Sequence, residues 1–114
     1  MSRKKTFVGK KLKATNLVLD LTTHKVTLEG LDLQLSTYEF SLLKTFMQKP
    51  HQVLTRDQLL DEMRGLEWET ENRSIDVAVS RLRQKLNDSP KSPQFLKTIW
   101  GDGYCFISNV EEIV

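Results

Sequence analysis

Apolar residues follow two different spacings along this chain, and each spacing predicts a different kind of element. Between residues 7 and 35 the apolar residues come in short runs with polar neighbours, a pattern typical of strands. We expect strands near residues 7–8, 16–20, 25–29 and 32–35, which would form a small antiparallel sheet at the amino end.

From residue 36 onwards the apolar spacing becomes helical, and capping boxes mark the starts of two helices. Ser36 with Glu39, and Thr55 with Gln58, each place a hydroxyl at the N-cap and a carboxyl or amide group three residues later. We expect these helices to end near residues 49 and 63, before a proline and a glycine respectively.

The segment Asn72–Leu86 has the clearest amphipathic pattern. At about 100° per residue, one narrow stripe holds its large apolar residues: Ile75, Val79, Leu82 and Leu86. The opposite face is polar and cationic: Arg73, Val77, Ser80, Arg81 and Gln84. The two flanks hold Arg83 with Asp76, and Ala78 with Lys85. The pattern therefore predicts a helix with one buried stripe and one cationic face.

Two interpretations of that cationic face stay open at this point. Charged faces of surface helices are commonly exposed only to water. A DNA groove is the other possibility, because arginine reaches guanine edges or phosphates while a small apolar group such as Val77 meets a thymine methyl. The helix by itself does not decide between them.

The last third of the chain predicts a loop and a hairpin. Prolines and small polar residues fill 87–94, and strands are expected at 95–100 and 104–107 around a Gly-Asp-Gly turn. Residues 109–114 are expected to be a tail. The order predicts an α+β fold: a winged helix-turn-helix with a small N-terminal antiparallel sheet, three helices and a C-terminal β-hairpin wing.

Charge is distributed unevenly along the 114 residues, which are enough for one domain. Six of the 17 Lys and Arg residues lie within residues 1–13, where there is no acid. The rest of the chain therefore has 11 basic and 15 acidic residues, a net charge of −4. A nucleic-acid function must depend on a local patch, which residues 72–86 supply with four cations and one acid.

Other classes of function find little support in the residues. No apolar run is long enough to cross a membrane. His24 and His51 have no metal-ligand spacing, Gly101 and Gly103 join two strands, and Cys105 lies in an apolar run that predicts burial. We therefore expect no enzyme activity, no metal and no cofactor, and a cytoplasmic location.

Four blocks of sequence resemble the OmpR/PhoB-type winged-helix effector domain of bacterial two-component response regulators. They are LSTYEFSLLKTFM, VLTRDQLLDEM, RSIDVAVSRLRQKL and IWGDGYCF, in the order and at spacings suited to that family. The resemblance divides the chain into a basic linker or disordered arm (1–6), the winged-helix domain (7–108) and the tail (109–114).

The resemblance implies that the third helix enters the major groove and the wing meets the adjacent backbone or minor groove. Four of the residues it implicates in DNA binding would face bases or nearby phosphates: Arg73, Val77, Arg81 and Gln84. Four others would meet phosphates: Ser74, Ser80, Arg83 and, at the base of the wing, Thr98. Ala78 and Trp100 complete the set. Ala78 stands where other members often have a larger polar side chain. Trp100 stands where many have arginine; it could stack on a sugar or pack against the domain, and packing is the favoured expectation.

Two further features are implied by the same resemblance. The acidic loop at 66–71 matches a segment that can contact RNA polymerase, through Glu67, Trp68, Glu69 and Glu71; a solvated connector is the competing interpretation. Arg56 and Asp76 match positions near the starts of helices two and three, where an ion pair would fix the angle between the helices.

The implied partner is double-stranded DNA with tandem half-sites. In full-length members an amino-terminal receiver domain, phosphorylated on aspartate by a sensor histidine kinase, drives pairing on the repeats. The isolated domain is expected to be a monomer. The alternative is a winged-helix module that binds protein, for example RNA polymerase, with little affinity for DNA; the net charge of −4 and the missing wing arginine favour it.

Overall fold

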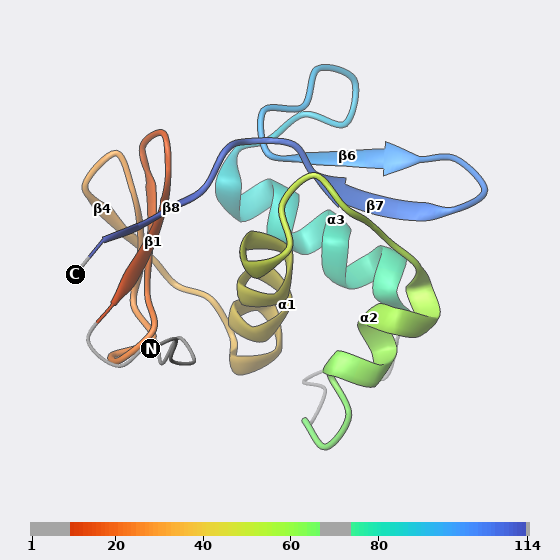
Figure 1. Cartoon of the computed structure of the whole chain (residues 1–114), viewed down its shortest axis with the longest axis horizontal. Helices are drawn as coiled ribbons and strands as arrows, with labels where there is room; N and C mark the ends of the chain where they lie inside the picture. Colours follow the sequence, from red (N-terminus) through yellow and green to blue (C-terminus); the bar gives the residue numbers. More distant parts are fainter. Residues whose placement is uncertain (1–9, 67–73, 114) are drawn as a thin grey trace, which may run out of the picture.

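The computed structural model describes residues 10–66 and 74–113, which form two antiparallel sheets and three helices (Figure 1). The helices are α1 (Thr37–Gln48), α2 (Arg56–Glu62) and α3 (Ile75–Leu86). The strands are β1 (Lys11–Ala14), β2 (Leu17–Asp20), β3 (Val26–Leu28), β4 (Leu31–Leu33), β5 (Val53–Leu54), β6 (Leu96–Ile99), β7 (Gly103–Phe106) and β8 (Glu111–Ile113). The predicted α+β class, with its N-terminal sheet and C-terminal hairpin, is confirmed.

The N-terminal sheet has the strand order β4-β3-β2-β1-β8, all antiparallel. Leu12 lies opposite Leu19 and Ala14 opposite Leu17, and all four side chains are buried. The predicted strand at 7–8 lies outside the described residues. Strand β1, which the sequence analysis did not predict, begins at Lys11, and its alternating lysines place Leu12 and Ala14 on the inner face.

The carboxyl end of the chain adds a strand that the sequence did not predict. We expected a tail after residue 108, but β8 pairs with β1, with Lys11 opposite Ile113 and Lys13 opposite Glu111. A Lys10–Glu112 ion pair of 3.5 Å lies across the same edge. Opposite charges on facing strands favour this pairing although the strand has little apolar character.

Helix α1 lies between the N-terminal sheet and α2, and it packs against both α2 and α3 (Figure 1). Both predicted capping boxes, at Ser36 and at Thr55, are present. Glu39 Oε1 accepts a hydrogen bond from Ser36 N at 3.0 Å and another from Lys85 Nζ at 2.7 Å. The side chain that caps α1 therefore also ties it to α3.

Helix α3 begins after the N-cap Ser74 and ends at Asn87, which takes the left-handed conformation with φ 57°. Its predicted stripe is buried: Ile75, Val79, Leu82 and Leu86. Because the stripe packs into the core shared with α1, the opposite face of α3 is turned outward.

The second sheet has the order β5-β7-β6 and forms the wing. Gly103 opens β7 with φ +149°, and a Cβ at this position would lie 2.1 Å from the Leu54 carbonyl oxygen. Only glycine lets β7 approach the end of β5 so closely. The hairpin therefore starts from a fixed point beside α2, which follows Leu54 in the chain.

Candidate nucleic-acid interface

The outer face of α3 carries the side chains that the sequence assigned to it. Ser80, Arg81 and Gln84 are exposed and Val77 is half-buried. Arg73 lies outside the described residues. The described members of the face thus leave the domain together, as an interface requires, and none of them belongs to the core.

The prediction for Ala78 is wrong. Its side chain is only 1% exposed and belongs to the core. The buried side of α3 is wider than the apolar stripe, because α1 packs against a flank as well. The methyl group of Ala78 is enclosed by the core and is not presented on the outer face of α3, where a base would be contacted.

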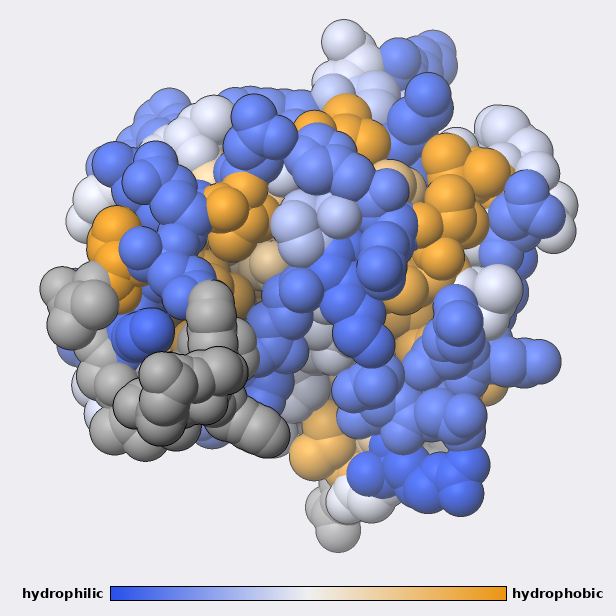
Figure 2. All heavy atoms as spheres, in the orientation of Figure 1, coloured by the Kyte–Doolittle hydropathy of each residue, from blue (hydrophilic) through white to orange (hydrophobic). Residues whose placement is uncertain are grey.

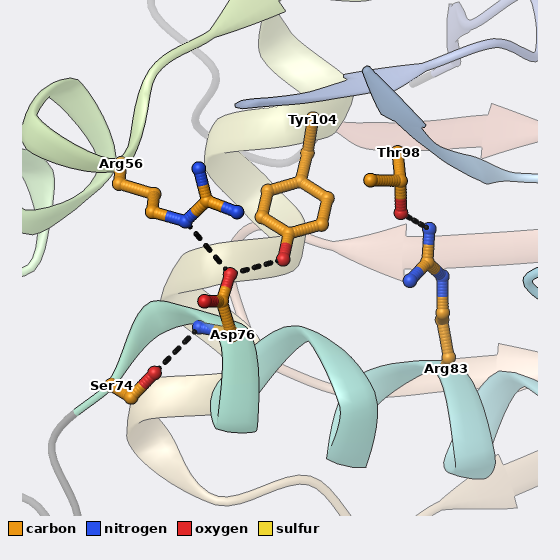
Figure 3. A network of polar contacts seen from close by, with 6 residues as sticks. All are labelled: Arg56, Ser74, Asp76, Arg83, Thr98 and Tyr104. Carbon is orange, nitrogen blue, oxygen red and sulfur yellow. Dashed lines mark hydrogen bonds and ion pairs between the residues drawn. The ribbon is translucent and has the colours of Figure 1, made fainter. Parts of the chain in front are cut away.

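The prediction for Arg83 is also corrected. This side chain is 7% exposed, and its Nη2 donates hydrogen bonds to Leu96 O at 2.9 Å and to Thr98 Oγ1 at 2.8 Å (Figure 3). Its guanidinium also lies over the Tyr104 ring, with 5.7 Å to the ring centroid. Arg83 therefore joins α3 to β6 inside the molecule instead of extending toward a phosphate.

Thr98 gains a defined role from this contact. Its oxygen accepts the hydrogen bond from Arg83, so its hydroxyl hydrogen can donate outward. The side chain is half-buried, at the base of the wing. The phosphate contact of Thr98 stays a prediction, with a hydroxyl that keeps a donor while its oxygen accepts from Arg83.

The predicted ion pair between Arg56 and Asp76 is present, and a tyrosine joins it. Arg56 Nε donates to Asp76 Oδ1 at 2.9 Å, and the Tyr104 hydroxyl donates to the same oxygen (Figure 3). The hydrogen bond from Tyr104, followed by that from Arg56, holds the pKa of the Asp76 carboxyl below its usual value, against the opposing effect of burial. Burial and this same bond raise the pKa of Tyr104. One carboxylate thus links α2, α3 and β7.

Ser74 caps the amino end of α3, and its side-chain oxygen accepts from Asp76 N at 3.0 Å (Figure 3). Its predicted contact with a phosphate remains a prediction. The cap orients the first turn of α3, from which Asp76 reaches the other two elements.

A buried acid, Asp88, fixes the loop between α3 and β6. The Asp88 carboxylate, 7% exposed, accepts backbone hydrogen bonds from Gln94 at 2.6 Å, from Phe95 at 3.2 Å and from Leu96 at 2.8 Å. The sequence analysis missed this residue, because an aspartate in a polar loop has the pattern of a solvated one. Asp88 sets where β6 begins relative to the end of α3.

A hollow of about 430 Å³ lies under the wing. Its walls are Arg56, Arg83, Pro90, Lys91, Pro93, Lys97, Thr98, Trp100 and Tyr104. They include four cationic side chains and no carboxylate. The sequence analysis missed Lys91, Lys97 and Tyr104, which the fold brings to α3 from a loop and two strands. Such a site favours an anionic ligand.

Trp100 is 88% exposed at the end of the hairpin. The expectation that it packs against the domain is therefore wrong. Trp100 lies beside a closed turn, in which Asp102 N donates to Ile99 O at 2.9 Å and Gly101 takes φ +85°. The indole is thus presented at the end of the wing, outside the core.

The remaining candidate groups add no second site. Glu67, Trp68, Glu69 and Glu71 lie outside the described residues, so the loop that could contact polymerase is untested. Within residues 10–66 and 74–113 no group of three or more His, Cys, Asp or Glu side chains could hold a metal. The helices of that part are too short or too polar to cross a membrane. Cys105 is buried, which raises the pKa of its thiol.

The fold and this face define a winged helix-turn-helix effector domain of the OmpR/PhoB type, a class of DNA-binding transcription regulators. The family described as "Transcriptional regulatory protein, C terminal" matches residues 30–106. The chain belongs to this family, which is not a family of enzymes.

Curated relatives and solved structures agree with this assignment. Regulatory protein VirG of Rhizobium rhizogenes is 49% identical over 82 residues, covering 72% of this chain and 34% of that protein. VirG of Agrobacterium tumefaciens (strain 15955) is 43% identical over 98 residues, 85% of this chain and 37% of that protein. The chain thus spans about a third of the length of these relatives.

The DNA-binding domain of Klebsiella pneumoniae RstA, solved in complex with the RstA box, superposes with a TM-score of 0.76 at 36% identity, covering 85% of this chain and 96% of that one. The DNA-binding domain of Escherichia coli CpxR gives a TM-score of 0.71 at 33% identity, with 86% and 96% covered.

Proposed function

We propose that this chain binds double-stranded DNA in a sequence-specific manner as the output domain of a two-component transcriptional response regulator. One observation carries the proposal: the exposed face of α3 lies on the same helix as Arg83, which forms a wall of the cationic hollow under the wing. A major-groove element and a phosphate-binding surface are thereby held in one rigid unit, as groove recognition requires.

Base contacts are assigned to the described outer face of α3. Arg81 has the fork of donors that matches guanine O6 and N7, and Gln84 can pair with the adenine edge. Val77, half-buried one turn before Arg81, offers an apolar contact to a thymine methyl. Arg73 is proposed to act at the amino end of the same face, on a base or a nearby phosphate.

Phosphate contacts are assigned to three hydroxyls and to two lysines that line the hollow. Ser74, Ser80 and Thr98 are the proposed hydroxyl donors, and Lys91 and Lys97 add two cations that the sequence analysis did not include. Helix α3 then lies in the major groove while the wing follows the adjacent backbone or minor groove. These contacts set register, and the contacts of α3 set sequence preference.

The longer protein is proposed to carry a receiver domain, phosphorylated in response to a sensor histidine kinase, that pairs two output domains on tandem half-sites. The share of VirG that this chain spans, 34%, leaves room for such a domain. The output domain alone is expected to be a monomer with weak affinity for one half-site. The 66–71 loop is the proposed contact for RNA polymerase.

A second candidate function is a protein-binding module with little affinity for DNA. Figure 2 shows apolar surface over the part of the molecule where β5 and β7 lie in Figure 1, and Val53 of β5 is 44% exposed. An apolar strip of this kind is a common feature of protein contacts. Val53 is not among the residues that line the cationic hollow, so the two functions can be tested by separate substitutions.

The test is binding of the chain to a random-sequence duplex pool, measured by fluorescence anisotropy from ~50 to ~200 mM salt. DNA binding predicts a steep loss of affinity as salt rises, because phosphate contacts release counterions. Arg81→Ala should weaken binding, whereas Lys25→Ala, in the turn before β3, should not. Repeated selection from the pool should then enrich one half-site. A flat salt response without enrichment would favour the protein-binding module.

A further inference from the structure

The end of the wing presents an apolar group where the surrounding surface is charged. Trp100 is 88% exposed, the highest value among the large apolar residues that the structure describes as exposed. It stands on the rim of the cationic hollow, beyond Lys97 and Thr98 on the same hairpin. A ligand that fills the hollow therefore reaches the indole next.

Charge at this point argues against an ionic contact. Asp102 is exposed in the same turn, two residues after Trp100, and it would repel a phosphate. The lysines of the hollow, Lys91 and Lys97, lie in the loop before β6 and on β6 itself, away from the turn. The tip thus offers a flat aromatic face and one N–H donor, which suit the face of a base or a deoxyribose better than a phosphate oxygen.

We propose that Trp100 is a minor-groove wedge: its indole enters the groove beside the backbone held in the hollow and partly unstacks one base step. Apolar side chains inserted in this way kink a duplex toward the major groove. This inference rests on the proposed DNA-binding function, which it deepens by assigning a specificity-determining residue. The hairpin suits the task because its turn is closed by the Asp102 N to Ile99 O hydrogen bond.

The wedge has two consequences that a cationic contact would not have. Its contribution is insensitive to salt, since no counterion is released when an indole stacks. It also selects deformable sequence at a position that no hydrogen bond reads, because pyrimidine–purine steps unstack more easily than others.

The experiment uses the whole chain and a duplex that contains the half-site enriched from the random pool. In a series of such duplexes, 2-aminopurine replaces one base at a time in the base steps next to those that α3 contacts. The wedge predicts that 2-aminopurine fluorescence rises at one step when the chain binds. Trp100→Ala should abolish that rise and weaken binding about 10-fold or more. The slope of log affinity against log salt concentration (the salt slope) should not change. Trp100→Phe should keep most of both.

The matched control is Lys97→Ala, on the same hairpin, which should reduce the salt slope by about one while leaving the fluorescence rise in place. Because Trp100 is exposed, its variants should have the same Tm as the parent chain. The fluorescence measurement on the parent chain tests the wedge even without a variant. Binding without any rise in 2-aminopurine fluorescence overturns the wedge and leaves the proposed function standing. Failure of the parent chain to bind any duplex overturns both.

Discussion

Arg81 and Arg83 form a matched pair two residues apart on α3, and burial is what separates them. Arg81 is exposed, whereas Arg83 is 7% exposed and donates to Leu96 O and Thr98 Oγ1. Replacing each by alanine removes the same side chain from the same helix. We predict opposite outcomes: Arg83→Ala destabilises the fold, and Arg81→Ala weakens DNA binding.

The size of the Arg83 effect follows from its contacts. Two hydrogen bonds from a charged donor contribute about 1.5–3 kcal/mol each. Desolvation of the guanidinium offsets part of this, since its buried Nε has no acceptor among the described residues. A net loss of about 2–4 kcal/mol is a large share of the 5–15 kcal/mol typical of a domain. It corresponds to a fall in Tm of about 8–16 °C.

The assay is thermal unfolding followed by circular dichroism, together with DNA affinity measured below the transition. Arg83→Lys keeps the charge without the fork of donors, so its Tm should fall between those of the parent and Arg83→Ala. Arg81→Ala should keep the parent Tm within about 2 °C and lose about 1–3 kcal/mol of binding, with relaxed preference at one base pair.

One result would refute the placement of Arg83 inside the molecule. If Arg83→Ala melts with the parent and instead lowers the salt slope of DNA binding by about one, Arg83 is a phosphate contact. Uniform weakening of Arg81→Ala on all sequences would likewise make Arg81 a phosphate contact and remove it from base recognition.

Three further predictions concern the framework that holds the interface. Asp88→Ala should lower the free energy of unfolding, measured with urea, by about 3–5 kcal/mol, because it leaves three backbone N–H groups near β6 without their charged acceptor. The control Asp32→Ala, at an exposed position of β4, should leave this free energy nearly unchanged. The pKa of Asp76 is lowered in the folded state, so its stabilising effect is present at pH values above the ordinary carboxyl pKa of 3.8 and is lost as the pH falls below it. Asp76→Asn should flatten this part of the plot of unfolding free energy against pH, and an unchanged plot would contradict the network. Gly103→Ala should cost at least about 2 kcal/mol, because its Cβ would meet the Leu54 carbonyl; a Tm equal to that of the parent would exclude this close approach.

Local sequence was sufficient to predict the three helices and to predict which face of α3 is buried. Capping boxes at Ser36 and Thr55 involve residues three apart, and the stripe through Val79 and Leu82 repeats every three or four residues. Such patterns depend only on neighbours along the chain, so the sequence contains everything needed to recognise them.

The flanks of α3 and the ends of the strands were decided by tertiary structure. Ala78 and Arg83 lie beside the stripe, where exposure depends on how closely α1 and β6 approach, and helical periodicity does not specify that distance. Strand β8 forms because the edge of β1 is available to pair. Trp100 is exposed because no other described element covers the end of the hairpin. For Ala78, Arg83 and β8 the deciding contact joins residues far apart in the chain, and a pattern of near neighbours carries no information about it.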